Sequence, residues 1–198
     1  SKYVTNKKKY LAVRFPKHKL FKELLKQLNY PLAAPSANIA TKVSAVQAID
    51  VKEEFGNKIK YILDGGRCAI GIESTIINLT SKPVILRLGG LDVLKIQKTL
   101  GLRINININS NKKIAPGQSL LHYSPGIPLK MNVLKAKNDE AFILIKKRKT
   151  KLKNYFYLSM KNDLNEAAKN LYSCLREIKN KDYKSIVVEK ISNKGLGR

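Results

Sequence analysis

Segments with the apolar spacing of a helix alternate with short apolar runs along this chain, and this order favours a layered α/β fold. The helix predicted at 44–56 has Ser44 as its candidate N-cap and Gly56 as its candidate C-terminal residue. Helices are predicted at 18–29, 44–56, 91–101 and 164–180. Strands are predicted at 10–15, 30–35, twice within 58–80, and at 83–88, 141–145, 154–159 and 185–191.

The alternating Ile and Asn residues of 103–109 fit either an edge strand or a linker. We favour a linker, because asparagine is a poor strand former and the alternation is followed by a polar stretch of Asn, Ser and Lys. The chain is therefore predicted to have three parts: an α/β unit over 1–102, a linker over 103–121 and a smaller α/β unit over 122–198.

The chain has 198 residues with 39 Lys and Arg against 14 Asp and Glu, a formal net charge of +25. Such a charge attracts phosphate-bearing partners such as nucleotides or RNA. The alternative is a base composition that favours lysine codons throughout. We favour this alternative as the main source of the excess, because the lysines are dispersed and are not interleaved with aromatic residues.

The sequence gives no sign of a disulfide framework or a transition-metal site. Cys68 and Cys174 are far apart and have no CxxC partner, and His18 and His122 are equally separated. No apolar run approaches the roughly 20 residues that span a bilayer, and the first residues lack the apolar stretch of a signal peptide. We therefore expect a cytoplasmic protein without a metal site and without a membrane partner.

Polar side chains follow the predicted strands of the first half. Ser36 and Asn38 leave the strand at 30–35, and ligands of open α/β sheets bind at strand ends. Arg14 lies within an apolar strand, where a charge persists only if it is paired. The alternatives are a turn with local hydrogen bonds for Ser36 and Asn38, and an internal carboxylate partner for Arg14.

A second group of polar residues precedes and follows the strands near 76–88. Glu73, Ser74 and Thr75 are consecutive, and Arg87 ends an apolar run before two glycines. Hydroxyls, an amide and arginines at strand ends suit an anionic small molecule and a nucleotide. The alternatives are a cap or bulge at 73–75 and an ion pair of Arg87 with Asp64 or Glu73. No P-loop and no GxGxxG motif is present, so phosphates are not expected to bind in those ways.

The motifs "PLAAPSAN", "LDGGRCAIGIESTIINL", "ILRLGG" and "APGQSLLHYSP", in this order, resemble the threonylcarbamoyl-AMP synthase family, the YrdC-like proteins. The stretch after "HYSP" resembles the C-terminal domain of its two-domain form. The resemblance implies the C-terminal part of a YrdC-like twisted-sheet catalytic domain over 1–102, a linker, and a small Rossmann-like α/β domain. It also implies a fragment that lacks the N-terminal half of the catalytic domain, with its Lys/Arg phosphate motif, and that is inactive alone.

The resemblance implies that L-threonine, bicarbonate and ATP are converted to threonylcarbamoyl-AMP and pyrophosphate with Mg²⁺, without a covalent nucleophile, for threonylcarbamoyladenosine in tRNA. The residues implied to bind threonine are Arg14, Ala34 and Ser74. The residues implied to bind ATP are Tyr10, Ser36, Asn38, Ser44, Arg87 and Tyr123. Tyr10 departs from the family, which usually has a small hydroxyl residue there, and the loop "NIATKVS" lacks the family's glycine and proline.

The resemblance implies a downstream tRNA threonylcarbamoyl transferase complex as partner, and tRNA or double-stranded RNA is a further expected partner. Two alternatives remain open beside the enzyme. The chain could be a basic RNA-binding module without catalysis, or an inactive remnant.

Overall fold

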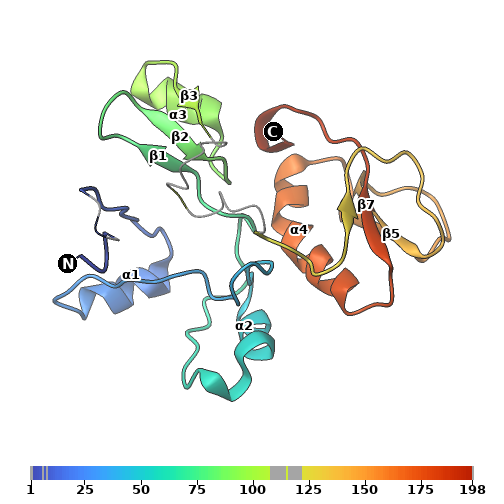
Figure 1. Cartoon of the computed structure of the whole chain (residues 1–198), viewed down its shortest axis with the longest axis horizontal. Coiled ribbons are helices and arrows are strands. Elements are labelled where there is room, and N and C mark those ends of the chain that lie inside the picture. Colours follow the sequence, from blue (N-terminus) through green and yellow to red (C-terminus); the bar gives the residue numbers. More distant parts are fainter. Residues whose placement is uncertain (1, 6, 8, 108–114, 116–121, 198) are drawn as a thin grey trace.

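The computed structural model describes residues 2–5, 7, 9–107, 115 and 122–197, and these form two α/β halves joined in sequence near 107–122 (Figure 1). The first half contains α1 (Lys19–Lys26), α2 (Ala48–Phe55), the 3-10 turn η1 (Gly56–Lys58), β1 (Ile76–Asn78), β2 (Val84–Arg87), α3 (Val93–Leu100) and β3 (Asn105–Ile106). The second half contains β4 (Leu129–Lys130), β5 (Glu140–Lys146), β6 (Tyr155–Ser159), α4 (Leu164–Lys179), β7 (Ser185–Val188) and the 3-10 turn η2 (Gly195–Gly197).

The second half is built on a parallel sheet of four strands in the order β4-β7-β5-β6. The central strands β5 and β7 are buried almost throughout, which explains their continuous apolar runs. Helix α4 lies beside this sheet and buries one apolar face. Its N-terminus is capped by Asp163, which accepts a hydrogen bond from the backbone N–H of Asn165.

The first half has a smaller sheet in the order β1-β2-β3, with β1 antiparallel and β3 parallel to β2. Helix α3 begins at its N-cap Asp92 and ends at Gly101, which has the left-handed conformation that glycine favours. Val93 and Ile96 of α3 pack on Ile85 of β2 and form a small separate core. The predicted α/β class is confirmed, and the structure adds that the sheet of the second half is parallel. A Rossmann-like second domain is not confirmed, because α4 is the one long helix among its described residues.

Several predicted elements of the first half are wrong. Residues 10–15 and 30–35 form no strand, and neither does the first piece within 58–80. A strand is stabilised by hydrogen bonds with a neighbouring strand, and no described strand pairs with these runs. Arg14 is consequently exposed and is not a buried charge, and Phe15 beside it is 92% exposed.

Two boundaries also differ from the prediction. Helix α2 begins at Ala48 with Gln47 as N-cap, because the Asp50 carboxylate accepts hydrogen bonds from the N–H groups of Val46 and Gln47. Ser44 is therefore not the cap. Residues Asn105–Ile106, which we placed in the linker, form strand β3 because β2 offers them a parallel partner. Residues 108–114 and 116–121 of the predicted linker lie outside the described residues, and the domain boundaries stay a prediction.

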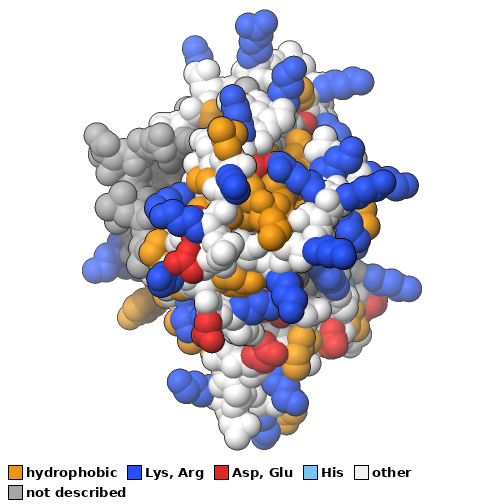
Figure 2. Space-filling model, turned by 90° about the vertical axis from the view of Figure 1, so that its right-hand side faces the viewer, with side chains coloured by type: hydrophobic (Ala, Val, Ile, Leu, Met, Phe, Trp, Pro, Cys, Tyr) orange, Lys and Arg blue, Asp and Glu red, His pale blue; other side chains and the backbone are white. Residues whose placement is uncertain are grey.

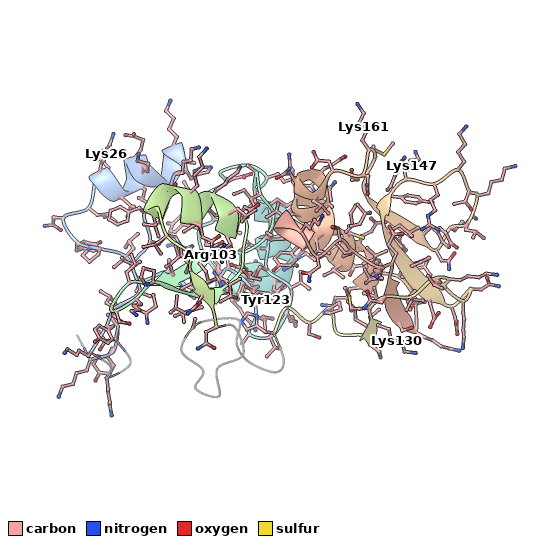
Figure 3. The ribbon with its side chains drawn as sticks, turned by 90° about the horizontal axis from the view of Figure 1, so that it is seen from above. Lys26, Arg103, Tyr123, Lys130, Lys147 and Lys161 are labelled. Atoms are coloured by element: carbon pink, nitrogen blue, oxygen red, sulfur yellow. The ribbon has the colours of Figure 1, made fainter. Side chains whose placement is uncertain are left out.

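The positive charge is spread over the surface. Figure 2 views the molecule from the side of the second half and shows Lys and Arg side chains over most of that face, with few acidic groups and an apolar area between them. Lys147 and Lys161 extend from the strand ends of this half (Figure 3). This distribution agrees with the dispersed lysines seen in the sequence.

Candidate functional site

Arg87, the last residue of β2, is the centre of a polar cluster. Its Nε donates to the backbone oxygen of Ser74 at 2.9 Å, and its Nη1 donates to the hydroxyl of Tyr123 at 3.2 Å. Its Nη2 lies 3.8 Å from Oε2 of Glu73. The side chains of Arg87 and Glu73 are 12% and 20% exposed, so this ion pair is largely removed from water. The alternative interpretation, that Arg87 pairs with Glu73, is confirmed.

Ser44 joins the cluster from the loop before α2. Its hydroxyl donates to Oε1 of Glu73 at 2.5 Å, a short hydrogen bond of the kind that a charged acceptor makes. Ser44 is buried. The Glu73 carboxylate therefore lies between a hydroxyl donor and a guanidinium, and each of its oxygens faces one of them.

The backbone around Glu73 is held by the loop after β2. The backbone N–H of Gly90 donates to the backbone oxygen of Glu73 at 2.8 Å, and the Thr75 hydroxyl donates to the backbone oxygen of Leu91 at 2.8 Å. These bonds bring the segment before β1 and the end of β2 side by side. Together with the antiparallel pairing of β1 and β2, they explain why Ser74 and Arg87, 13 residues apart in sequence, lie together.

Tyr123 closes the cluster from the start of the second half and lies between the two halves in Figure 3. Its ring stacks on Tyr172 of α4, with centroids 5.9 Å apart, and contacts His122. The N–H of Ser124, the next residue, donates to the Thr41 oxygen at 2.8 Å. Burial raises the pKa of Tyr123, and the neighbouring Arg87 opposes that rise. The phenol is therefore neutral and can both donate and accept a hydrogen bond.

Asn38 lies at the start of the loop that carries Ser44. Its Nδ2 donates to the backbone oxygens of Ile39 and Lys42 at 2.9 and 3.1 Å, which fixes the amide plane. Its Oδ1 is buried, and no described residue donates to it. A buried acceptor without a donor is costly, so this oxygen is suited to accept from a ligand.

The structure brings together four of the predicted site residues, Ser44, Ser74, Arg87 and Tyr123, and places Asn38 on the loop that leads to them. The remaining predicted residues are Tyr10, Arg14, Ala34 and Ser36. All four are exposed, and no described hydrogen bond or ion pair joins them to the cluster. Tyr10 contacts Lys9, whose ammonium lies 5.9 Å from the ring centroid.

Sequence reasoning missed two residues that support the cluster. Tyr172 stacks on Tyr123, and Arg176 bonds the backbone of the Ser44 loop. Both belong to α4, and their spacing in the sequence indicates only that this helix has a partly buried face. Glu73 was part of the second polar group and was considered as an arginine partner, but no ligand was assigned to it; its place after a glycine-containing turn and before two hydroxyl residues was a usable signal.

Among the described residues no three His, Cys, Asp or Glu side chains are grouped so as to hold a metal ion. The same part of the chain contains no helix that is long and apolar enough to cross a membrane.

The fold and this cluster define a two-part α/β protein with a polar site where its halves meet. A family model described as telomere recombination matches residues 1–89, and one described as the C-terminal domain of threonylcarbamoyl-AMP synthase matches residues 89–198. The chain belongs to the threonylcarbamoyl-AMP synthase family, as its motifs indicated.

Curated relatives match nearly the whole chain. It is 34% identical to threonylcarbamoyl-AMP synthase of Pyrococcus abyssi over 94% of this chain and 60% of the relative. It is 32% identical to that of Schizosaccharomyces pombe over 100% of this chain and 57% of the relative. A crystal structure of P. abyssi Sua5 complexed with L-threonine superposes with a TM-score of 0.86 at 32% identity, over 100% of this chain and 63% of that one.

The chain thus spans about three fifths of the length of these relatives. The expectation that it is a fragment is not confirmed by these matches.

Proposed function

We propose that this chain acts in the synthesis of L-threonylcarbamoyladenylate from L-threonine, bicarbonate and ATP, for threonylcarbamoyladenosine in tRNA. The observation that carries the proposal is the similarity of the whole chain to a structure complexed with L-threonine, at a TM-score of 0.86. The names of the curated relatives point to the same activity. The activity is proposed because the chain spans only part of their length.

The site supports binding of anions and of a nucleotide. Arg87 supplies positive charge in a partly buried position, and Ser44 and Tyr123 supply hydroxyl groups beside it. The unpaired Oδ1 of Asn38 can accept a hydrogen bond from an amino or hydroxyl group of the ligand. We assign ATP to Tyr10, Ser36, Asn38, Ser44, Arg87 and Tyr123.

We assign L-threonine to Arg14, Ala34 and Ser74. Arg14 makes no described ion pair, so its guanidinium can form two parallel hydrogen bonds with a carboxylate. Ser74 is exposed and its hydroxyl has no described partner, while its backbone oxygen is held by Arg87. The backbone of Ala34 is exposed and can bond the amino acid.

The proposed reaction has two bond-forming steps. The threonine amine joins bicarbonate with loss of water to give a carbamate, and a carbamate oxygen then attacks the α-phosphorus of ATP as pyrophosphate leaves. Neither step needs a covalent bond to the protein. The chain's residues align the two substrates and stabilise the charge on the phosphate oxygens.

Mg²⁺ binds through oxygen ligands and usually keeps several waters, with phosphates supplying part of its shell. The described residues do not offer such a site, since they hold no group of acidic ligands and the Glu73 carboxylate is already bonded by Ser44 and Arg87. We therefore assign no step to the ion.

An RNA-binding module without catalysis is not favoured, because the relatives carry the name of an enzyme. Binding of tRNA or double-stranded RNA, the transferase complex as partner and the cytoplasmic location stay predictions.

Titration calorimetry of the chain with L-threonine and with ATP tests the proposal, and release of pyrophosphate tests turnover. We expect saturable binding of both substrates, with L-threonine bound more weakly after Ser74→Ala. Lys179→Gln, on the exposed side of α4, serves as the control and should leave binding unchanged. A chain that is folded but binds neither substrate would overturn the proposal. Pyrophosphate release that needs both threonine and bicarbonate would contradict the expectation that this chain is inactive alone.

A further inference from the structure

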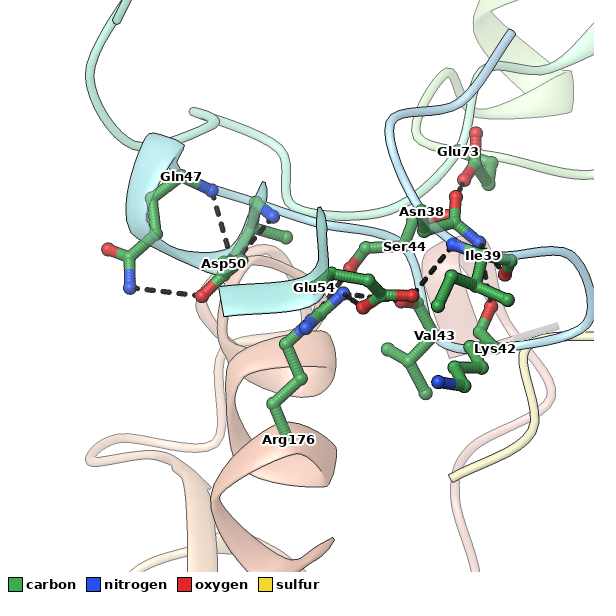
Figure 4. A network of polar contacts seen from close by, with 11 residues as sticks. Asn38, Ile39, Lys42, Val43, Ser44, Gln47, Asp50, Glu54, Glu73 and Arg176 are labelled. Atoms are coloured by element: carbon green, nitrogen blue, oxygen red, sulfur yellow. Dashed lines mark hydrogen bonds and ion pairs between the residues drawn. The ribbon is translucent and has the colours of Figure 1, made fainter. Parts of the chain in front are cut away.

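The guanidinium of Arg176 reaches from α4 in the second half to the loop that carries Ser44 in the first. Its Nη2 donates to the backbone oxygen of Val43 at 2.8 Å, and its Nε donates to that of Ser44 at 3.4 Å. The same Nη2 lies 2.8 Å from Oε2 of Glu54 in α2. Among the described residues, this is the one ion pair that joins the two halves (Figure 4).

Glu54 holds the other end of the same loop. Its Oε1 accepts a hydrogen bond from the backbone N–H of Ile39 at 2.7 Å. The pair therefore ties the loop on both sides, at Ile39 through the carboxylate and at Val43 and Ser44 through the guanidinium. The side chains of Arg176 and Glu54 are 17% and 5% exposed, so neither end is easily replaced by water.

The loop from Ile39 to Ser44 carries or borders the groups proposed to bind nucleotide. The Ser44 hydroxyl donates to Glu73, and the Asn38 amide donates to the backbone of Ile39 and Lys42. A shift of this loop would move the Ser44 hydroxyl away from Glu73 and turn the Asn38 amide. The position of both groups depends on the backbone that Arg176 and Glu54 fix.

We propose that Arg176 is a positioning residue: from the second half it fixes the loop 39–44 and so sets the affinity of the site for ATP. The nucleotide part of this inference rests on the proposed function, whereas the fixing of the loop does not. Arg176 touches no ligand group directly in this scheme. The planar fork of arginine matters, because one guanidinium serves two backbone oxygens and a carboxylate at once.

Arg176→Lys tests the inference, since lysine keeps the charge but cannot reach three acceptors in one plane. Lys181→Gln is the matched control, because it breaks an exposed ion pair with Glu177 at the end of the same helix. Hydrogen exchange is measured for residues 39–46 and for the core strand β5, in the chain without ligand. We expect exchange in 39–46 to rise about tenfold in Arg176→Lys, with β5 unchanged, because only local opening becomes easier.

The second measurement is ATP binding, with L-threonine binding as the internal comparison. Arg176→Lys should weaken ATP binding by about tenfold and leave threonine binding within about twofold, as one lost charge-assisted contact allows. Glu54→Gln should resemble Arg176→Lys, and the double variant should add little to either, because both act through one contact.

Unchanged exchange at 39–46 in Arg176→Lys would overturn the inference, as would an equal rise in β5, which would mean a general loss of stability. Faster exchange at 39–46 with unchanged ATP affinity would overturn the link to the nucleotide. If the unaltered chain binds no ATP, the proposed function fails, and the exchange data still decide whether Arg176 fixes the loop.

Discussion

The two halves of the molecule differ in how they bury their apolar residues. In the second half, β5 and β7 are buried almost from end to end, and Phe142, Leu144 and Ile186 have no exposed surface. In the first half, Val13, Phe15 and Tyr61 are each more than 70% exposed. The second half therefore contains an extensive core, whereas the first half has a small core around Ile85 and leaves many large apolar side chains exposed.

The first half rests on the second at a few points. Val43 and Val46 belong to the same buried cluster as Ile178 of α4. The Arg67 guanidinium donates to Asn170 and Ser173 on α4. The candidate site lies at this junction, so the well-packed half supplies rigidity to a site whose side chains come mostly from the other half.

The largest contrast should appear when an aromatic side chain is removed from each half. Phe142→Ala should lower the free energy of unfolding by about 3–5 kcal/mol, because it leaves a cavity beside Tyr155 in a fully buried position. Phe15→Ala removes a side chain that is 92% exposed and should cost less than about 0.5 kcal/mol. Urea unfolding followed by circular dichroism measures both. Equal costs would show that Phe15 is buried in solution and that the contrast is wrong.

A smaller effect is expected where the halves touch. A side chain at Gly71 would bring its Cβ to 2.5 Å from the backbone of Lys169 on α4, and φ there is +81°. Gly71→Ala should therefore cost about 1–3 kcal/mol from overpacking in addition to the strain of a positive φ. Gly66→Ala is the matched control, since φ is +78° but no described atom lies within 4 Å of the added Cβ, so it carries the backbone strain without the overpacking. A cost for Gly71→Ala no larger than that for Gly66→Ala would mean that the halves do not dock as described.

The same difference decides what could be predicted from the sequence. The strands at 141–145 and 154–159 and the helix at 164–180 are confirmed, because β5 pairs with the next strand β6 and the apolar patterns of these elements match their burial. The apolar run at 10–15 looks equally strand-like, yet a run of residues does not reveal whether a partner strand lies beside it.

The residues of the polar cluster were predicted only in part, because a sequence does not show which distant residues become partners. Ser44, Ser74, Arg87 and Tyr123 were identified through motifs, and the structure joins them. The residues that support them, Tyr172 and Arg176, were not identified. Glu54, the partner of Arg176, lies 122 residues away, and no pattern in the sequence marks this pairing.

Acid should weaken the junction before it weakens the core of the second half. Burial opposes ionisation of Glu54, but the Ile39 N–H and the Arg176 guanidinium outweigh it and lower the pKa of Glu54 below its usual 4.5. A lowered folded-state pKa stabilises the fold fully above pH 4.5, and this contribution is lost as the pH falls through the folded value. Exchange at residues 39–46 should therefore rise in acid more than exchange in β5.

Glu54→Gln should remove the pH dependence at 39–46, and Glu177→Gln, in an exposed pair, should not. If exchange at 39–46 rose in acid as much in Glu54→Gln as in the unaltered chain, a titrating group other than Glu54 would be responsible.

The smallest expected effect concerns the aromatic residue at the junction. Tyr123→Phe removes the hydroxyl that accepts from Arg87 at 3.2 Å and keeps the ring that stacks on Tyr172. The loss should be about 0.5–1.5 kcal/mol, the net value of one hydrogen bond, because Arg87 keeps Ser74 and Glu73 as partners. Tyr157→Phe is the control in the second half, since the one hydrogen bond of its hydroxyl among the described residues is a long one, 3.5 Å to the exposed backbone oxygen of Arg148. Urea unfolding of both variants gives the stability difference, and calorimetry gives the change in ATP affinity. Because we assign Tyr123 to ATP, we expect ATP affinity to fall by more than stability; lower stability with unchanged ATP affinity would mean that the hydroxyl only supports the junction. A fall in ATP affinity larger than the fall in stability would place the hydroxyl on the nucleotide itself.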